Sequence, residues 1–208
     1  KLILFWTDHF GNRTTDVGYG NWVYQQHQLI RQYALGNFKS LVRLISVDVS
    51  MLRFLNGYLN YVTAPDENYA RELMELFTLG KGPDSKYTET DVKEAAKVLT
   101  GWTINTATFQ PVFTVSRHST VNKTFSSFFN NTIITGRNTT TAGTLELDDL
   151  LNMIFSQQEV AKYIARRIYR WFVYYQIDAE AERNVITPLA DIFRNSGYEI
   201  KPMLTALF

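Results

Sequence analysis

The segment from Asp66 to Gly80, DENYARELMELFTLG, constrains the fold of this chain more than any other stretch. Pro65 and Asp66 suit the start of a helix, and Gly80 suits the left-handed position just after its end. Between these signals, apolar residues recur at spacings of three and four, the period of one helix face. These residues are Tyr69, Leu73, Leu76, Phe77 and Leu79. We therefore predict a helix over 66–80 that buries this face.

The same period recurs through most of the chain, between clear breaks. It predicts helices at 2–10, 21–34, 38–46, 88–100, 145–155, 160–172, 179–195 and 200–208. A short further helix is expected to begin at Asp48 or Ser50. Thr88, followed three residues later by Asp91, resembles a capping box. No apolar run approaches the roughly 18–20 residues that a membrane span needs, so no span is expected. The prediction is an all-α, multi-helix globular domain over 1–208.

One stretch breaks the helical pattern. Residues 102–143 are dense in Thr, Asn, Ser and Phe and carry few acidic side chains. Within it, 108–115 has enough β-branched and aromatic residues for a strand, and 131–135 is its expected partner. We interpret 102–143 as a loop-rich insertion with a small β-hairpin. Because the chain opens and closes within apolar patterns, we also expect it to be a trimmed part of a longer protein.

Charge and cysteine content narrow the function classes. The net charge is +1, so there is no global field to attract nucleic acid, and no nucleic-acid partner is expected. The chain has no cysteine, which excludes a thiolate nucleophile, a disulfide framework and Cys-ligated metals. Lys162, Arg166 and Arg170 form a basic stripe among aromatic residues. We interpret this stripe as a solvated face that pairs with acidic helices such as 67–75.

The densest polar cluster lies on the 66–80 helix. Glu72 and Glu75 share a helix face, and Arg71 lies one turn from both Glu67 and Glu75. Two carboxylates beside an arginine could act as general acid and base, or hold a cation. The alternative is a set of ion pairs that only stabilise the fold. In either case, we predict a carboxylate partner for Arg71.

The only histidines are His9, His27 and His118, far apart in the sequence. His9 follows Asp8, and such a pair could orient a base or ligate a metal. A fold that brought His9 and His118 to Glu75 would build a catalytic site, although a buried structural role is the alternative for each histidine. No His-Glu-x-x-His motif, Gly-x-Ser-x-Gly elbow or phosphate-binding loop is present.

Several motifs together resemble those of a known family. They are LFWTDHF at 4–10, QQHQLIR at 25–31 with ALGNF at 34–38, DENYARELMELFTLG at 66–80, YTETDV at 87–92, EAA at 94–96 and LTGW at 99–102. With these motifs the chain is similar to the bacterial domain-of-unknown-function family eighteen hundred, whose members are mostly exported. Asp66 stands where the family tends to have Asn. His118 and Lys123 match family positions, but the loop between them differs. The resemblance implies a fold group and an exported location, and no reaction.

Two functions remain open. The first is an exported structural or interaction protein of the cell envelope with a protein partner. The second is an uncharacterised enzyme, a hydrolase, that uses the Glu72 and Glu75 carboxylates with His9 or His118, with or without a metal. Candidate binding residues are Asn68, Arg71 and Lys123, and the cofactor is unknown. A pocket that converges on Glu75 and a histidine favours the enzyme, whereas an exposed aromatic patch favours the interaction protein.

Overall fold

Helices make up 61% of the chain, and the computed structural model describes all of residues 1–208. The first half contains α1 (Leu2–His9), α2 (Thr14–Val17), α3 (Gly20–Tyr33), α4 (Phe38–Ser46), α5 (Val49–Phe54), α6 (Asn68–Glu72), the π-helical turn η2 (Leu73–Thr78) and α7 (Glu89–Val98). The second half contains α8 (Ala142–Ser156), α9 (Gln158–Phe172), α10 (Ala179–Ala181), the π-helical turn η5 (Glu182–Ile186), α11 (Thr187–Asn195) and α12 (Ile200–Leu207). The prediction of a mostly helical globular fold is confirmed.

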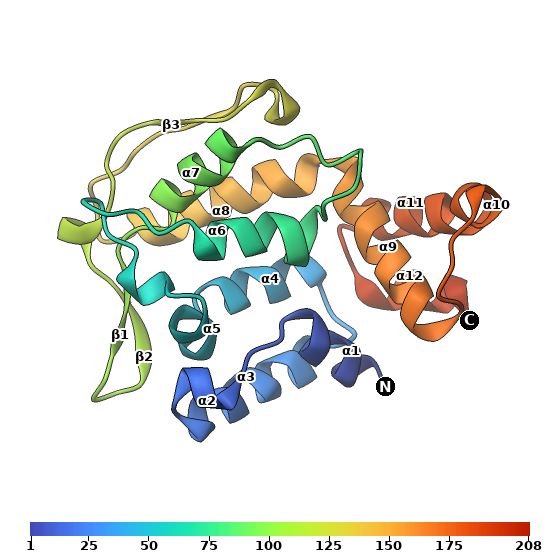
Figure 1. The fold of residues 1–208 in the computed structure, drawn as a ribbon, viewed down its shortest axis with the longest axis horizontal. Helices are drawn as coiled ribbons and strands as arrows, with labels where there is room; N and C mark the ends of the chain where they lie inside the picture. Colours follow the sequence, from blue (N-terminus) through green and yellow to red (C-terminus); the bar gives the residue numbers. More distant parts are fainter.

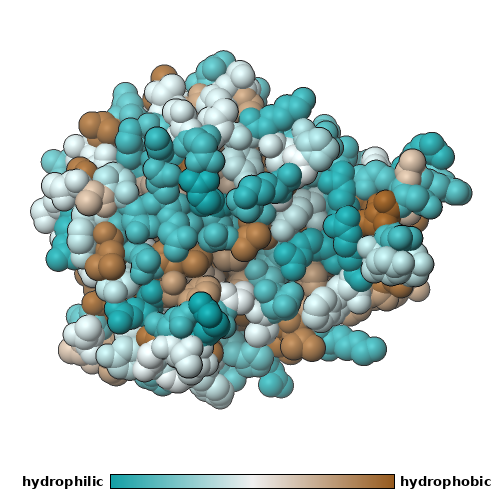
Figure 2. Space-filling model, viewed as in Figure 1, coloured by the Kyte–Doolittle hydropathy of each residue, from teal (hydrophilic) through white to brown (hydrophobic).

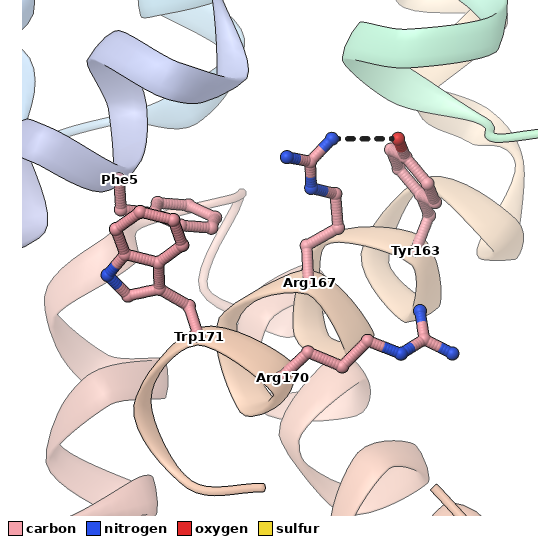
Figure 3. A pocket seen from close by; sticks show the side chains of 5 residues that line it. All are labelled: Phe5, Tyr163, Arg167, Arg170 and Trp171. Carbon is pink, nitrogen blue, oxygen red and sulfur yellow. Dashed lines mark hydrogen bonds between the residues drawn. The ribbon is translucent and has the colours of Figure 1, made fainter. Parts of the chain in front are cut away.

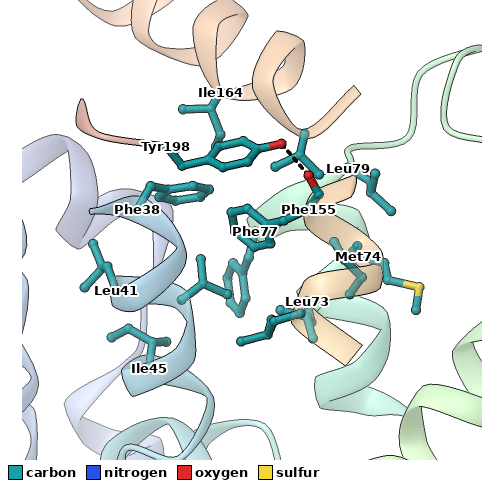
Figure 4. Close-up of a cluster of buried hydrophobic side chains, with 14 of the residues drawn as sticks. Phe38, Leu41, Ile45, Leu73, Met74, Phe77, Leu79, Phe155, Ile164 and Tyr198 are labelled. Atoms are coloured by element: carbon teal, nitrogen blue, oxygen red, sulfur yellow. Dashed lines mark hydrogen bonds between the residues drawn. The ribbon is translucent and has the colours of Figure 1, made fainter. Parts of the chain in front are cut away.

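The helices surround one large hydrophobic cluster of 44 buried residues. In Figure 1, α4, α6 and α8 occupy the middle, α1–α3 lie along one side, and α9–α12 form the end where both termini lie. Figure 4 shows how η2 enters this core. Its Leu73 and Phe77 belong to the same buried cluster as Phe38 of α4, Phe155 of α8 and Ile164 of α9. Burying each such side chain stabilises the fold by about 1.5–3 kcal/mol.

The helix predicted over 66–80 is present, but its second half is π-helical. The Leu79 amide donates to the Met74 carbonyl at 2.8 Å, and the Thr78 hydroxyl donates to the Leu73 carbonyl at 2.5 Å. A π-helical turn holds more residues than an α-helical turn, so the buried positions shift along the sequence. Leu73, Met74, Phe77 and Thr78 are buried, while Leu76 is 44% exposed. The predicted burial of Leu76 is therefore wrong.

The helix end is as predicted. Gly80 has φ +77°, in the left-handed region that favours glycine. A Cβ at this position would also lie 2.6 Å from the Tyr163 ring, so any side chain here would clash with α9.

The start of α7 explains why the capping box carries Asp in place of Glu or Gln. Thr88 and Asp91 form the predicted reciprocal box. The Asp91 carboxylate, however, also accepts hydrogen bonds from the Ser126 amide at 2.7 Å and the Ser126 hydroxyl at 2.8 Å. This short, fully buried side chain therefore caps a helix and anchors the insertion at the same time.

All strands lie within 102–143, as predicted, but their pairing differs. β1 (Trp102–Asn105) pairs antiparallel with β2 (Gln110–Phe113), and β3 (Lys123–Thr124) pairs antiparallel with β4 (Ile133–Ile134). The predicted pairing of 108–115 with 131–135 is therefore wrong. The Asn105 side chain accepts from the amides of Ala107 and Thr108, which closes a local turn between β1 and β2. Pairing of two strands that are close in the sequence costs less loop-closure entropy than pairing of two strands that are far apart.

The surface is polar over most of the face shown in Figure 2, where hydrophobic side chains appear as separate small patches. Among the helices, none combines the length and the apolar composition needed to cross a membrane.

Candidate functional site

The polar residues of the central helix are held mainly by ion pairs. The Arg71 guanidinium donates to both carboxylate oxygens of Glu89 at 2.8 and 2.7 Å, and to Glu67 at 3.2 Å. The predicted carboxylate partner of Arg71 is confirmed, and the bidentate contact joins α6 to the start of α7. Asn68 donates to the Leu55 carbonyl at 3.4 Å, so it links α6 to the end of α5.

Glu72 and Glu75 lie close enough to affect each other. Lys81 Nζ lies 2.7 Å from Glu75 Oε1, so Glu75 has a cationic partner. Glu72 Oε2 is buried and accepts no hydrogen bond. Burial raises the pKa of Glu72, and the neighbouring charge of Glu75 raises it further. The structure therefore brings the two predicted carboxylates together, without a histidine beside them.

His9 belongs to the aromatic core. Its ring packs against those of Phe5, Trp6, Phe10, Phe38 and Phe77. Its Nε2 donates to the Phe77 carbonyl at 3.1 Å, and its Nδ1 has no partner. Burial, together with the charge of Arg167, lowers the pKa of His9 to about 3. His9 is therefore neutral at ordinary pH and holds α1 against the end of η2.

His118 lies in a separate, fully buried group that we call the insertion cluster: His118, Lys123 and Glu146. Lys123 Nζ lies 2.5 Å from Glu146 Oε2 and donates to the Ser119 carbonyl at 2.6 Å. His118 Nδ1 lies 2.9 Å from the Thr100 carbonyl oxygen. Its Nε2 is 3.1 Å from Glu146 Oε1, within ion-pair distance but not aligned as a hydrogen bond.

The insertion cluster ties β3 to α8. All three side chains are 0% exposed. Burial lowers the pKa of Lys123. Burial would raise the pKa of Glu146, but contacts with His118 and Lys123 outweigh it and hold that pKa below its ordinary value. Sequence reasoning missed Glu146, and the signal was available: it is a charged residue on the same face as Leu150, within an apolar stripe.

The four candidate catalytic residues therefore do not meet. Glu72 and Glu75 are on the central helix, His9 is in the core, and His118 is in the insertion cluster. None of the main surface hollows is lined by any of them. No group of three or more His, Asp and Glu side chains is placed to hold a metal ion.

A different region carries accessible polar and aromatic groups. A hollow lies between α1 and α9, and its volume is about 380 Å³. Figure 3 shows the side chains that line it: Phe5, Tyr163, Arg167, Arg170 and Trp171. The rings of Phe5 and Trp171 meet edge to face at 5.7 Å. The Arg167 guanidinium lies beside them, 3.4 Å from the Tyr163 hydroxyl and 3.5 Å from the Asp8 carboxylate.

The basic stripe of α9 divides into paired and unpaired arginines. Arg166 pairs with Glu159 at 2.5 Å and Glu182 at 2.6 Å. The predicted pairing of this stripe with 67–75 is therefore wrong, because closer carboxylates on α9 and η5 bind Arg166 instead. Arg170, one turn later, is exposed and makes no ion pair.

Exposed aromatic side chains continue from this hollow past the end of α9. Trp171 is 40%, Tyr174 53% and Tyr175 67% exposed, and the two tyrosine rings lie 4.7 Å apart. We call Arg167, Arg170, Trp171, Tyr174 and Tyr175 the α9 face. Sequence analysis identified its residue types but not the hollow, which requires Phe5 from the other end of the chain.

Comparison with known proteins gives a family and no activity. No curated protein and no solved structure matches this chain. One family model, described as a protein of unknown function (DUF1800), matches residues 1–208. This agrees with the resemblance seen in the motifs. The chain belongs to the DUF1800 family.

Proposed function

We propose that this chain is a protein-interaction domain whose α9 face binds an acidic segment of a partner protein. One observation carries the proposal. Arg170 makes no ion pair and Arg167 makes only long contacts, yet both line a hollow bounded by aromatic rings. The other arginine of this stripe, Arg166, is already neutralised inside the fold.

The chemistry of the α9 face favours a carboxylate-bearing peptide. A guanidinium presents a planar fork of donors that matches a carboxylate. Exposed tryptophan and tyrosine supply rigid contact area, and Trp, Tyr and Arg are the residues most enriched at the centres of protein interfaces. Because the net charge of the chain is only +1, attraction of an acidic partner depends on this local surface and not on a global field.

Export and a place in the cell envelope are part of the same proposal, and they are supported by the resemblance to a mostly exported family. Fractionation of bacteria that express the full-length natural protein tests them. Recovery with the envelope or the medium supports this part of the proposal, and recovery with the cytoplasm contradicts it.

A second candidate function, a hydrolase, is favoured by one observation. Glu72 has a raised pKa beside a second carboxylate, Glu75, and such pairs can divide the roles of acid and base. Three features oppose it: Lys81 pairs with Glu75, the histidines are engaged elsewhere, and no main hollow opens at the pair. Turnover of an ester, amide or glycoside that Glu75→Gln abolishes, without unfolding the chain, would establish this alternative.

The test of the interaction proposal is selection of binders from a displayed random peptide library. We expect the selected peptides to be enriched in Asp or Glu together with an aromatic residue. Arg170→Glu should weaken their binding at least about tenfold, equivalent to about 1.4 kcal/mol. Lys93→Glu, at an exposed position of α7, gives the same change in net charge and should leave binding nearly unchanged.

Three results would contradict the proposal. The first is enrichment without acidic residues, and the second is equal loss of binding in both variants. The third is tighter, Arg170-dependent binding of a single-stranded oligonucleotide, which would identify nucleic acid as the partner.

A further inference from the structure

A second hollow, independent of the α9 face, lies among α1, α2 and α3. Its volume is about 390 Å³. Its lining includes the side chains of Thr7, Asn12, Tyr24, Gln26 and His27, and it contains no carboxylate, ammonium or guanidinium group. Amide, hydroxyl, imidazole and phenol groups provide donors and acceptors without a fixed charge.

Gln26 provides a buried donor with no partner in the protein. Its side chain is only 3% exposed. Its Oε1 accepts from Asn12 Nδ2, which also donates to the Ser50 hydroxyl at 3.0 Å. Its Nε2 makes no hydrogen bond. Buried polar groups are nearly always paired, so this unpaired amide is a candidate donor to a group bound in the hollow that Gln26 lines.

Other residues that line the hollow supply hydroxyl, imidazole and phenol groups. The Thr7 hydroxyl donates to the Ile3 carbonyl at 2.9 Å, so its oxygen can act only as an acceptor towards other groups. His27 Nδ1 is 3.4 Å from the same hydroxyl. Tyr24 also lines the hollow and is 63% exposed.

We propose that this hollow binds a neutral polyhydroxylated ligand, a sugar unit. Adjacent hydroxyl groups of a sugar both donate and accept, which matches neighbouring amide and hydroxyl side chains. The apolar face of the sugar ring can cover Tyr24. A charged ligand would lose hydration here without gaining a counter-ion.

The test is a titration of the isotope-labelled chain with uncharged sugars, followed by NMR. The probes are glucose, galactose, mannose, N-acetylglucosamine, cellobiose and chitobiose. We expect at least one to shift the Gln26 side-chain amide and the signals of Tyr24 and His27 in a saturable manner. Tyr24→Ala should weaken that binding at least about fivefold. Because Tyr24 is exposed, this variant should keep its fold, which the spectrum reports directly.

The control is Tyr175→Ala, which removes an equally exposed tyrosine from the α9 face and should leave sugar binding unchanged. The proposal is overturned if no probe shifts these signals in the folded chain. It is also overturned if Tyr24→Ala binds with unchanged affinity, or if acetate or lysine binds at the same place as strongly as the best sugar.

Discussion

His9 and Glu72 are partly or fully removed from water, and in both cases burial favours the neutral form. The pKa of His9 falls to about 3, whereas that of Glu72 rises. Because each group titrates differently in the folded and unfolded chain, each makes stability depend on pH, with opposite signs. Both effects are measurable without knowledge of a ligand.

For His9, acid should weaken the fold. His9 takes up a proton near pH 6.5 in the unfolded chain but only near pH 3 in the folded chain. The contribution of neutral His9 to the free energy of unfolding is therefore complete above pH 6.5 and is lost as the pH falls towards 3. The expected slope is about 1.4 kcal/mol per pH unit. His9→Gln can still donate to Phe77 but cannot be protonated. Urea unfolding between pH 6.5 and 4 should therefore show a flatter slope for this variant, with exposed His27→Gln as the control. Parallel slopes for wild type and His9→Gln would contradict this.

For Glu72, the sign is reversed. Its pKa in the folded chain lies above 4.5, so its favourable contribution is present below that pH and is lost as pH rises through the folded pKa. At pH 7 the charged, poorly solvated carboxylate destabilises the fold. Glu72→Gln should therefore raise the Tm at pH 7, and the gain should shrink near pH 4. Glu67→Gln, which weakens an Arg71 pair, should not raise it. A lower Tm for Glu72→Gln would show that its charge stabilises the fold.

At the scale of elements, the joint between α6 and η2 decides which side chains reach the core. A continuous α-helix would bury Leu73, Leu76 and Phe77 together, but the wider turn places Leu76 at the surface. The Tyr163 hydroxyl donates to the Leu76 carbonyl at 2.9 Å, so α9 contacts this turn through a backbone group.

Two matched substitutions test this geometry. Leu73→Ala should cost about 2–5 kcal/mol of unfolding free energy, because Leu73 is 0% exposed. Leu76→Ala should cost only about 0.5 kcal/mol or less, as at other surface positions. Chemical denaturation of the two variants measures both values. Equal, large losses would indicate a regular α-helix through Thr78.

The insertion cluster links two secondary-structure elements, because its buried ion pair holds β3 against α8. Lys123→Met would leave Glu146 buried without its cation and should cost about 3–5 kcal/mol. Adding Glu146→Leu should recover part of that loss, because the stranded charge is then gone. Lys97→Met, which removes a partly exposed pair, is the control and should have a small effect. Equal stability of Lys123→Met and the wild type would contradict a buried ion pair.

At the scale of the whole molecule, helix ends set by neighbouring residues were predictable from the sequence, whereas contacts between distant segments were not. Thr88 with Asp91 and the left-handed Gly80 mark helix ends within a few residues of sequence, and both predictions were confirmed. The partners of Glu146 and Arg166, and the hollow that pairs Phe5 with α9, depend on contacts between distant segments. Periodicity and capping carry no information about such contacts, so the sequence could not predict which of the candidate residues lie near one another.

The same long-range packing produces the feature that we consider functional. Phe5 of α1 lines the hollow together with Arg170 of α9, whose guanidinium makes no ion pair with a carboxylate of the chain. We propose that a carboxylate from a partner protein binds there. The most direct test is a charge exchange between Arg170 and the acidic residue of the tightest selected peptide.

The measurement consists of four dissociation constants. The wild-type chain and Arg170→Glu are each titrated with the acidic peptide and with a variant of this peptide in which Lys replaces the acidic residue. Each single change should weaken binding, and the double change should recover it. The expected coupling free energy is above about 1 kcal/mol. If the two changes weaken binding additively, with a coupling free energy near zero, Arg170 does not bind the acidic residue and the α9 face is not the proposed site for an acidic peptide.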